Sequence, residues 1–440
     1  MYKKISIIFL LITFSSIAIA NSKIEIRIMA HQELRLKVLR DLEPIIENRL
    51  SNVDFQIEVG PDRGGAYDTK LIAALRGGVA ADIFHVGDSA ASEIVSSGFS
   101  LDLTNRVQNW SGWNQFYDIA KSDMKKIGKG KVHSLPYTAS AMSIWYRKDL
   151  LKEAGVSQAQ PKTWKELLEK ARTVRQKSRA KYALMFPMGA IWGGGPWGEG
   201  FKHMLLASSV PRIIDSQGRV IAQSKGLLEV FKFYEVLVKE NMFQIDAMLA
   251  PLPHVIPKYQ QFPAAELAME TQGTWGWRFD YGPEGATPIP NITDVVGTWA
   301  FPTIDGSREP IVVGSTGPVF MINGNTKHPK ESWEVLKIIT SAEGIGRFGL
   351  SVGAIAPRKD ARKAFLPYAE NKQLLEDEDR LANLVNIPPF SGQRSVVLAV
   401  ATATEHLLLG RSAEQAMTTY TNMIKQAFRK KKDKIVVLPL

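Results

Sequence analysis

The chain has 440 residues, a formal net charge of +11 and 45% hydrophobic residues, a composition typical of a globular protein too long for one simple core. It contains no cysteine, which excludes a disulfide framework, a cysteine nucleophile, thiolate metal ligands and a lipid anchor attached through cysteine. Five cations lie in the run 429–434, but no aromatic residues are interleaved with them, so we expect no nucleic-acid partner.

The first twenty residues predict an export signal. Two lysines precede an apolar run over residues 5–14, and residues 18–20 (Ala-Ile-Ala) form the small-x-small pattern that signal peptidase reads. We therefore expect cleavage after Ala20. The run is shorter than the stretch of about 20 apolar residues that spans a bilayer, so a membrane anchor is the less favoured interpretation. With no cysteine to carry a lipid, residues 21–440 are predicted to form a free periplasmic protein.

The next segment alternates between strand and helix patterns. The expected elements are a strand at 24–28, a helix at 33–50, a strand at 54–59, a helix at 67–76 and a strand at 81–86 that ends at Gly87 and Asp88. Because strands alternate with helices, the sequence predicts an α/β unit with a largely parallel sheet.

The middle and the end of the chain continue this pattern. A strand is predicted over 141–146, and Thr163 and Glu166 have the spacing of a capping box that begins a helix. Residues 187–200 form a loop rich in glycine and tryptophan, and a second capping pattern at Ser412 begins the last long helix.

The sequence contains no motif that indicates a catalytic site or a cofactor. Residues 193–198 and 344–349 match G-x-G-x-x-G, but neither stretch follows a strand and opens a helix, so we expect no dinucleotide. The seven histidines are scattered with no pair at i, i+4, which argues against a histidine metal site. We therefore predict no catalytic residues, no metal and no cofactor.

Tryptophans in glycine-rich segments are the candidates for ligand contact. Trp192 and Trp197 flank a glycine run, and Trp275 follows Gly273. Flat rings suit the apolar faces of pyranoses, while neighbouring polar groups bond the hydroxyls. Each of these tryptophans could instead be a core residue, and both interpretations stay open; for Trp275 we favour the site.

Several blocks of the sequence resemble one known family. The blocks are residues 80–86, 98–103, 135–137, 144–151, 154–156, 161–167, 266–270 with 273–275, and 329–339 with 353–357. Together and in this order they resemble the family 1 extracellular solute-binding proteins, the maltose-binding-protein-like receptors of ABC importers. Arg147 replaces the asparagine usual in the family, and Ala81 stands where proline is common.

The resemblance implies a two-lobe α/β periplasmic-binding-protein fold with a ligand cleft between lobes that close by a hinge. It implies a first lobe of residues 21–136 plus 314–345 and a second lobe of residues 137–313 plus 346–440. The chain would cross between the lobes at 137–140, at 314–321 and near 345–357.

The resemblance also implies which residues line the cleft. The expected ligand-binding residues are His31, Gln32, Glu33, Asp88, Tyr137, Thr138, Ser140, Trp192, Trp197 and Trp275, with Arg358 and Arg394 as further candidates. Ser140 stands where maltose receptors tend to carry an acidic residue, which argues against maltose itself as the solute.

The function implied is that of the periplasmic substrate-binding component of an ABC importer. Such a protein is a monomer and not an enzyme; it captures a small solute, here a mono- or oligosaccharide, by lobe closure and delivers it to the transmembrane permease subunits. One alternative is an anionic solute such as glycerol 3-phosphate or an acidic sugar, bound by Arg63, Arg278, Arg358 and Arg394. Another is a secreted glycan hydrolase or lyase with Glu33 and Asp88 as its carboxylate pair.

Overall fold

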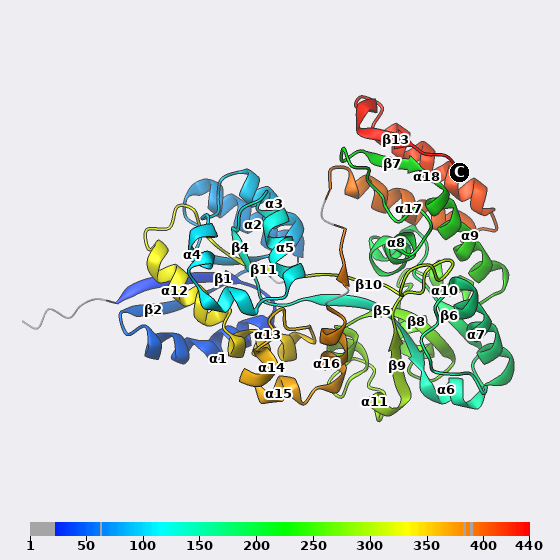
Figure 1. Ribbon diagram of the computed structural model, residues 1–440, viewed down its shortest axis with the longest axis horizontal. Helices are drawn as coiled ribbons and strands as arrows, with labels where there is room; N and C mark the ends of the chain where they lie inside the picture. Colours follow the sequence, from blue (N-terminus) through cyan, green and yellow to red (C-terminus); the bar gives the residue numbers. More distant parts are fainter. Residues whose placement is uncertain (1–22, 62–63, 382–383, 388–389) are drawn as a thin grey trace, which may run out of the picture.

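The computed structural model describes residues 23–61, 64–381, 384–387 and 390–440; the predicted export signal lies outside these residues. Figure 1 shows two lobes, each built on its own sheet and joined through β5 (Ser140–Arg147) and β10 (Val312–Ser315). The predicted two-lobe α/β fold is therefore confirmed. No helix in the described part of the chain has both the length and the apolar content needed to cross a membrane.

The first lobe is a five-stranded sheet covered by helices. Its strands lie in the order β2 (Val53–Val59), β1 (Ile24–Ala30), β3 (Ile83–Val86), β11 (Val319–Ile322) and β4 (Ser134–Pro136). β1 runs parallel to both of its neighbours, whereas β11 runs antiparallel to β3 and β4. Ile26 and Ile28 are fully buried, and this is the alternation that predicted the strand.

The helices of the first lobe come from two separate segments of the chain. They are α1 (Glu33–Arg49), α2 (Gly64–Gly77), α3 (Asp88–Ser96), α4 (Thr104–Gln108), α5 (Asp118–Ile127), α12 (Pro329–Ile339), α13 (Ala342–Val352), α14 (Ala361–Ala364), α15 (Leu366–Ala369) and α16 (Lys372–Asp379). Figure 1 shows the yellow and orange helices lying beside the blue helix α1. The later segment therefore returns to complete the first core.

The second lobe is centred on β5. The strands of its main sheet are β12 (Leu384–Val385), β10, β5, β8 (Leu267–Gly273) and β6 (Tyr182–Met185), and β9 (Val296–Trp299) also pairs with β5. A separate parallel pair joins β7 (Val220–Gln223) to β13 (Ile435–Val437). The helices are α6 (Lys148–Glu153), α7 (Trp164–Lys177), α8 (Lys202–Leu206), α9 (Lys225–Lys239), α10 (Ile245–Met248), α11 (Ile292–Val295), α17 (Gln393–Leu408) and α18 (Ala413–Ala427).

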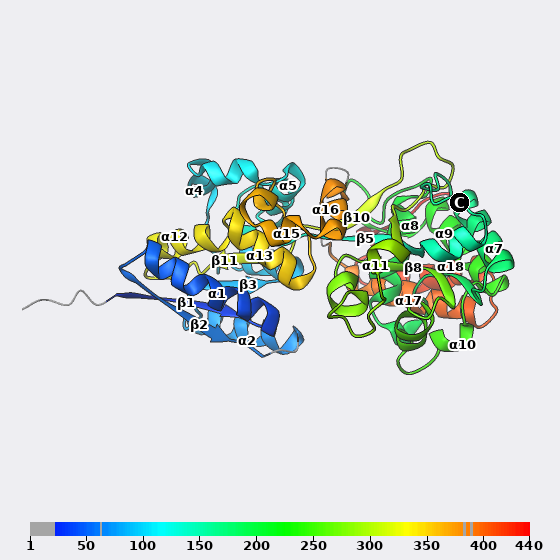
Figure 2. The ribbon, with the colours of Figure 1, turned by 90° about the horizontal axis from the view of Figure 1, so that it is seen from below.

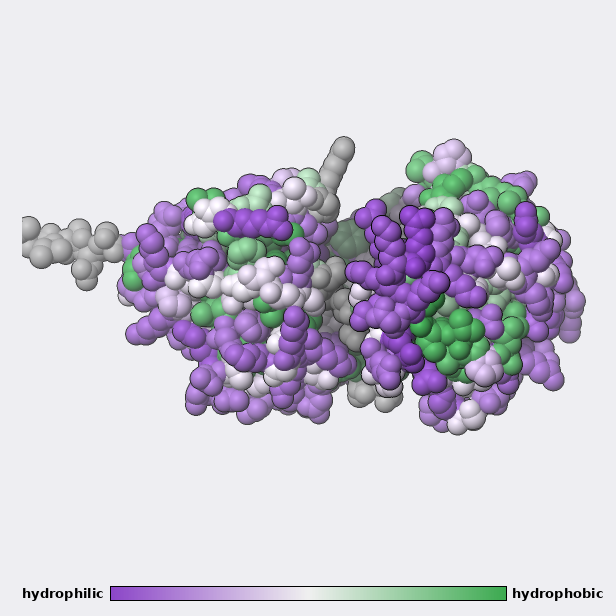
Figure 3. All heavy atoms as spheres, turned by 90° about the horizontal axis from the view of Figure 1, so that it is seen from above, coloured by the Kyte–Doolittle hydropathy of each residue, from purple (hydrophilic) through white to green (hydrophobic). Residues whose placement is uncertain are grey.

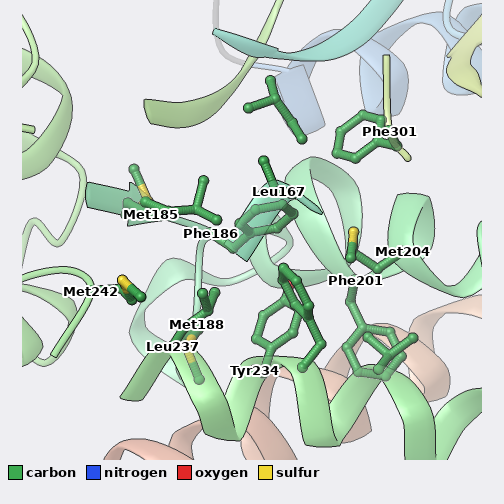
Figure 4. Close-up of a cluster of buried hydrophobic side chains, with 14 of the residues drawn as sticks. Leu167, Met185, Phe186, Met188, Phe201, Met204, Tyr234, Leu237, Met242 and Phe301 are labelled. Carbon is green, nitrogen blue, oxygen red and sulfur yellow. The ribbon is translucent and has the colours of Figure 1, made fainter. Parts of the chain in front are cut away.

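Aromatic and sulfur-containing side chains fill the second core. Figure 4 shows Phe186, Phe201 and Tyr234 packed between the sheet and the helices, with Met185 and Met242 nearby. All five side chains are fully buried. This continuous core holds the loops of the lobe in place, including the glycine-rich segment that precedes Phe201.

The helix caps agree with the sequence in one case and differ in detail in the other. Ser412 and Gln415 form the complete capping box of α18. At α7 the Thr163 side chain accepts from the amide of Glu166 at 3.1 Å, as expected. The Glu166 carboxylate, however, accepts from the amide of Lys162 at 2.8 Å, one residue before the expected donor.

The third passage between the lobes differs from the expected one. Residues 346–374 were expected in the second lobe, but Phe348, Tyr368 and Leu374 are fully buried in the first core. The reason is the apolar face of α13, which packs on α1. Ile355 exchanges two backbone hydrogen bonds with Ala139, at 2.7 and 2.8 Å, so this segment lies beside the first crossing without itself crossing. The chain reaches the second sheet only at β12.

Candidate functional site

A pocket in the second lobe opens where β8 ends. Its volume is about 390 Å³, and it is lined by Trp192, Gly195, Glu199, His254, Lys258, Tyr259, Trp275, Phe279 and Asp280. The amide of Thr274 donates to the carbonyl oxygen of Ala141 at 3.0 Å. Ala141 lies on β5, directly after the first crossing, so the pocket opens on the part of the second lobe nearest to the lobe junction.

Aromatic rings form one side of this pocket. Trp192 is half-buried and packs edge-on against His254, with ring centroids 6.2 Å apart. Trp275 is also half-buried, and its ring lies against Gly273 so closely that a Cβ there would meet the ring at 2.2 Å. Position 273 must therefore be glycine, because a side chain there would displace the indole of Trp275.

Polar side chains form the other side of the pocket, and no sequence pattern indicated any of them. Lys258 is only 6% exposed and forms an ion pair with Glu199, with 2.7 Å between Nζ and Oε2. The carboxylate of Asp280 accepts from the Tyr259 hydroxyl at 3.0 Å and from the Gln272 amide at 2.9 Å. These groups offer both hydrogen-bond donors and acceptors to a solute.

The polar pocket residues that the sequence did not indicate lie in backbone turns of a rare type. Glu199 lies in the π-helical turn η3 (Trp197–Phe201), Lys258 and Tyr259 in η4 (Val255–Gln261), and Asp280 in η5 (Trp277–Tyr281). Single π-helical turns are rare and occur frequently at functional sites. They have no residue pattern by which the sequence could have indicated them.

Buried ionisable side chains lie in and beside the pocket. Glu270 on β8 is fully buried, and the Tyr281 hydroxyl donates to its Oε1. Burial raises the pKa of Glu270 to about 8, although the ammonium of Lys258 opposes the shift. Burial alone would lower the pKa of Lys258, but attraction to Glu199 and Glu270 outweighs it and raises that pKa. Burial also raises the pKa of Asp280.

A cluster of rings lies at the same junction in the first lobe. His31 follows β1, and its ring centroid is 4.2 Å from that of Tyr67 and 5.1 Å from that of His85. The Tyr67 hydroxyl donates to the carbonyl oxygens of Met29 and His85 at 2.9 and 2.7 Å. Burial lowers the pKa of His85 well below its usual value, so its ring is neutral. Neither nitrogen of that ring has a hydrogen-bond partner among the described residues.

The crossing residues lie next to this cluster. Tyr137 is fully buried and packs on Phe320 and Phe348, with ring centroids 4.5 and 4.7 Å away. Thr138 is buried, and Ser140 begins β5 opposite Ser315. Of these three, only Ser140 is partly exposed to solvent.

The remaining first-lobe candidates differ in their surroundings. Gln32 is exposed, with a positive φ of 70°. Glu33 is exposed and pairs with Arg40, with 2.6 Å between Oε1 and Nη1. Asp88 begins α3, but its side chain lies outside the described part of the chain.

Three expected ligand contacts lie elsewhere. Trp197 lies in the π-helical turn η3, is 4% exposed and belongs to the second core. Arg358 is 5% exposed in the first lobe, where Asp360 and the carbonyl oxygen of Thr340 hold its guanidinium. Arg394 is exposed at the start of α17 and is not among the residues that line the pocket.

A second pocket, of about 550 Å³, lies between the lobes beside α1. It is lined from the first lobe by Leu34, Lys37, Val38, Asp41, Arg347, Leu350, Ser351 and Phe365, and from the second by Trp277, Arg278, Pro283 and Glu284. Arg278 spans the lobes, because its Nε donates to the carbonyl oxygen of Ser351 at 3.1 Å while Nη1 pairs with Glu284 at 2.6 Å. Both arginines of this pocket are already paired with carboxylates, Arg278 with Glu284 and Arg347 with Glu343, so the pocket offers no free pair of arginines to an anion.

The site has no described cluster suited to a metal. Among residues 23–61, 64–381, 384–387 and 390–440, no three His, Asp or Glu side chains lie close enough to hold an ion.

Comparisons with known proteins show the same overall fold. The chain is 22% identical over 352 residues to the multiple sugar-binding protein of Streptococcus mutans, which covers 75% of this chain and 74% of the relative. Its fold matches the sugar-binding protein MalE from Xanthomonas citri with a TM-score of 0.77 at 19% identity, over 93% of this chain and 98% of that one. It also matches the cyclic alpha-maltosyl-1,6-maltose binding protein from Arthrobacter globiformis with a TM-score of 0.73 at 18% identity, over 93% and 100% of the two chains.

The family assignment rests on a match over most of the chain. The family model for bacterial extracellular solute-binding proteins matches residues 44–345, a segment that includes the first crossing, the glycine-rich loop and the strand before Trp275. The same segment holds every residue that lines the second-lobe pocket. The chain belongs to the bacterial extracellular solute-binding protein family.

Proposed function

We propose that this protein is the periplasmic substrate-binding component of an ABC importer, which captures a mono- or oligosaccharide between its lobes and delivers it to a membrane permease. The observation that carries the proposal is the pocket at the lobe junction, where Trp192 and Trp275 face buried polar groups. Relatives and structural neighbours named as sugar-binding proteins support the same solute class.

The pocket chemistry suits a sugar ring. Pyranoses have apolar faces that pack on indoles and hydroxyl edges that require hydrogen-bond partners. Glu199 and Asp280 supply acceptors, and Lys258 supplies donors, close to the two tryptophans. Because these polar groups already bond one another, they are held in fixed positions before the solute arrives, which reduces the entropy lost on binding.

Lobe closure would complete the site. Figure 2 shows the lobes joined near β5, β10 and α16 and apart on the opposite side, and Figure 3 shows a groove between them. In the proposed closed state, the first-lobe side chains His31 and His85 would approach a solute held in the second-lobe pocket. A solute that contacts both lobes binds the closed state more tightly and therefore shifts the equilibrium toward it.

An anionic solute is less well supported. Of the four arginines considered for an anion clamp, Arg358 is bound to Asp360 and Arg278 to Glu284, while Arg394 is exposed on α17. The fourth, Arg63, lies outside the described residues. The second-lobe pocket itself carries two carboxylates against one ammonium, which disfavours a phosphate or a carboxylate there.

A glycan-cleaving enzyme is also less well supported. Glu33, one member of the suggested carboxylate pair, is exposed and bound to Arg40. The family is one of solute-binding receptors. If the bound solute is recovered intact after the complex is denatured, the enzyme alternative is excluded.

The proposed function includes a location outside the cytoplasm. We infer that the chain is exported, cleaved after Ala20 and released as a monomer in the periplasm. The family description as extracellular supports export. Intact-mass analysis of protein from the periplasmic fraction should give the mass of residues 21–440; retention of the first twenty residues would contradict the cleavage.

A thermal-shift screen tests the solute class. A ligand that binds only the folded state raises the melting temperature by mass action, and the increase grows with ligand concentration. We expect a clear increase with one or a few neutral mono- or oligosaccharides. An increase only with sugar phosphates or sugar acids would favour the anionic alternative, and no response to any sugar or sugar derivative would contradict the proposed solute class.

A further inference from the structure

A basic edge lies at the C-terminal tip of the second lobe, away from the candidate pocket. We define this C-terminal basic edge as Arg429, Lys430, Lys431, Lys432 and Lys434, all of which are exposed. Figure 1 shows the red segment that contains it at the upper margin of the second lobe, beyond α17. Nothing in the proposed capture of a solute uses these five cations.

The basic edge is an ordered turn. Phe428, which caps α18, is 9% exposed and belongs to the second core. Within the turn, the amide of Lys431 donates to the carbonyl oxygen of Phe428 at 2.8 Å, and the amide of Lys434 donates to that of Lys431 at 2.9 Å. On the far side, β13 pairs in parallel with β7. The five cations are therefore presented together by a fixed backbone.

Few acidic side chains neutralise the five positive charges of the basic edge. Among the ion pairs of the described residues, only Lys434 has an acidic partner, Asp433, at 3.8 Å with both side chains more than half exposed. An ion pair this long and this exposed contributes little free energy, so it barely neutralises Lys434. Because the cations lie within six consecutive residues, they are close compared with the screening length of about 8 Å at physiological salt and act on a partner as one positive patch.

Exposed apolar side chains follow the patch along the chain. Val437 is 48% exposed, and Leu440, which lies further on beside Met417 and Thr418 of α18, is 60% exposed. At a rise of about 3.3 Å per strand residue, Val437 lies about 10 Å along the chain from Lys434. Figure 3 looks onto this margin of the second lobe and shows strongly hydrophilic surface with hydrophobic surface beside it.

We propose that the C-terminal basic edge, with Val437 and Leu440, is a docking surface for the anionic phosphate headgroups of a membrane. Cations beside small exposed apolar groups match a lipid interface, where the charges meet phosphates and the apolar groups enter the headgroup region. A nucleic acid fits less well, because no aromatic residue lies within 429–434 to stack on bases. The chain has no cysteine for a lipid anchor, so this patch would supply weak, reversible attachment near the permease.

Vesicle co-sedimentation tests the proposal. Protein purified from the exported fraction is mixed with vesicles of pure phosphatidylcholine or of phosphatidylcholine with phosphatidylglycerol. We expect binding only to the vesicles that contain phosphatidylglycerol, with a severalfold loss between 50 and about 200 mM salt because the attraction is screened. Equal binding to both vesicle types, or none to either, overturns the proposal.

Charge reversal locates the surface. The variant Lys430→Glu, Lys431→Glu, Lys432→Glu should bind anionic vesicles at least tenfold more weakly. The matched control is Lys152→Glu, Lys162→Glu, Lys177→Glu, which makes the same change in net charge at three other exposed lysines of the second lobe. Comparable losses in both variants would mean that net charge, and not the basic edge, drives binding, and would overturn the assignment.

Two further measurements separate the apolar contribution and the binding of solute from the effect of charge. The variant Val437→Ser, Leu440→Ser should weaken vesicle binding severalfold while the salt dependence remains; an unchanged affinity removes the apolar part of the proposal. Solute binding, measured on the same samples, should be equal in all variants, so that failure of membrane docking and failure of the proposed sugar capture are told apart. Reduced transport in cells with unchanged vesicle binding would assign the edge to an acidic protein partner and overturn the membrane proposal.

Discussion

At the scale of single residues, two tryptophans from glycine-rich segments have opposite surroundings. Trp275 is half-buried in the pocket, whereas Trp197 is 4% exposed in the second core. Trp275→Ala should weaken solute binding at least tenfold, about 1.4 kcal/mol, with little change in melting temperature. Calorimetric titration together with thermal unfolding measures both quantities.

Trp197→Ala is the contrasting variant. Removal of a buried tryptophan from a packed core costs about 3–5 kcal/mol of stability. The protein should therefore unfold at lower denaturant concentration, while the folded fraction still binds the solute through Trp275. If instead Trp275→Ala is strongly destabilising and binds normally, Trp275 is a core residue and the pocket is misassigned.

Glu270 should make stability depend on pH. Its pKa is raised from the usual 4.5 to about 8 by burial, so the folded state keeps a proton that the unfolded state releases between these values. Since the unfolded state then binds fewer protons, the contribution of this group to the free energy of unfolding falls as pH rises from about 4.5 to about 8. Glu270→Gln removes this contribution and keeps an oxygen for the Tyr281 hydroxyl.

Urea unfolding of both proteins at pH 5, 6.5 and 8 measures the effect. The stability of the variant relative to the natural protein should increase across this series. Glu266→Gln, a change at the partly exposed position before β8, is the matched control and should show no such increase. Parallel curves for Glu270→Gln and the natural protein would show that Glu270 is ionised in the folded state.

At the scale of elements, the connection between the lobes is held by buried acids. Asp123 on α5 accepts from Thr316 in the second crossing at 3.0 Å and from Asn386 after β12 at 3.1 Å. On α16, Glu378 is fully buried and accepts from the hydroxyls of Tyr117 and Tyr368 at 2.8 and 2.9 Å. The second and third passages are therefore both tied to first-lobe side chains.

Arg380, at the end of α16, reaches the other lobe. Its Nη1 donates to the hydroxyl of Thr298 on β9 at 2.6 Å. Because this bond exists while the lobes are apart, its loss should make closure easier: Arg380→Ala should bind the solute about fivefold more tightly, for a hydrogen bond of about 1 kcal/mol. Calorimetric titration checks the affinity.

Arg362→Ala is the matched control for Arg380→Ala. Arg380 pairs with Asp377 of α16 at 3.1 Å, and Arg362 pairs with Glu378 of the same helix at 3.0 Å. Glu378, however, is held by Tyr117 and Tyr368 and does not reach the second lobe. The control should lower stability without changing affinity. An affinity increase in both variants, or in neither, would mean that the bond from Arg380 to Thr298 does not select the separated conformation.

At the scale of the whole molecule, the two cores are separate and only narrow connections join them. Figure 2 shows the lobes apart on one side and joined on the other. A saturating solute should therefore bring the lobes together as nearly rigid bodies. Small-angle X-ray scattering should record a smaller radius of gyration with solute for the natural protein, and Trp275→Ala should need at least tenfold more solute to reach the same decrease. An unchanged radius in the bound natural protein would contradict closure.

The sequence by itself determined the alternating strands of the first lobe, the caps of α7 and α18, and the family blocks that imply two lobes. These features depend on local periodicity or on residues close together in the chain, so their signal is local. Trp275 as a ligand contact stays a prediction; the structure places its ring in the pocket, against Gly273 two residues earlier.

Only the tertiary structure decided the polar half of the pocket and the course of the third passage. Glu199, Lys258 and Asp280 come from separate π-helical turns that meet only after the second core has formed. Residues 346–374 join the first lobe because the apolar face of α13 packs against α1. Trp197 and Arg358 are of residue types that suit a binding cleft, but burial is set by distant packing partners that no local pattern records.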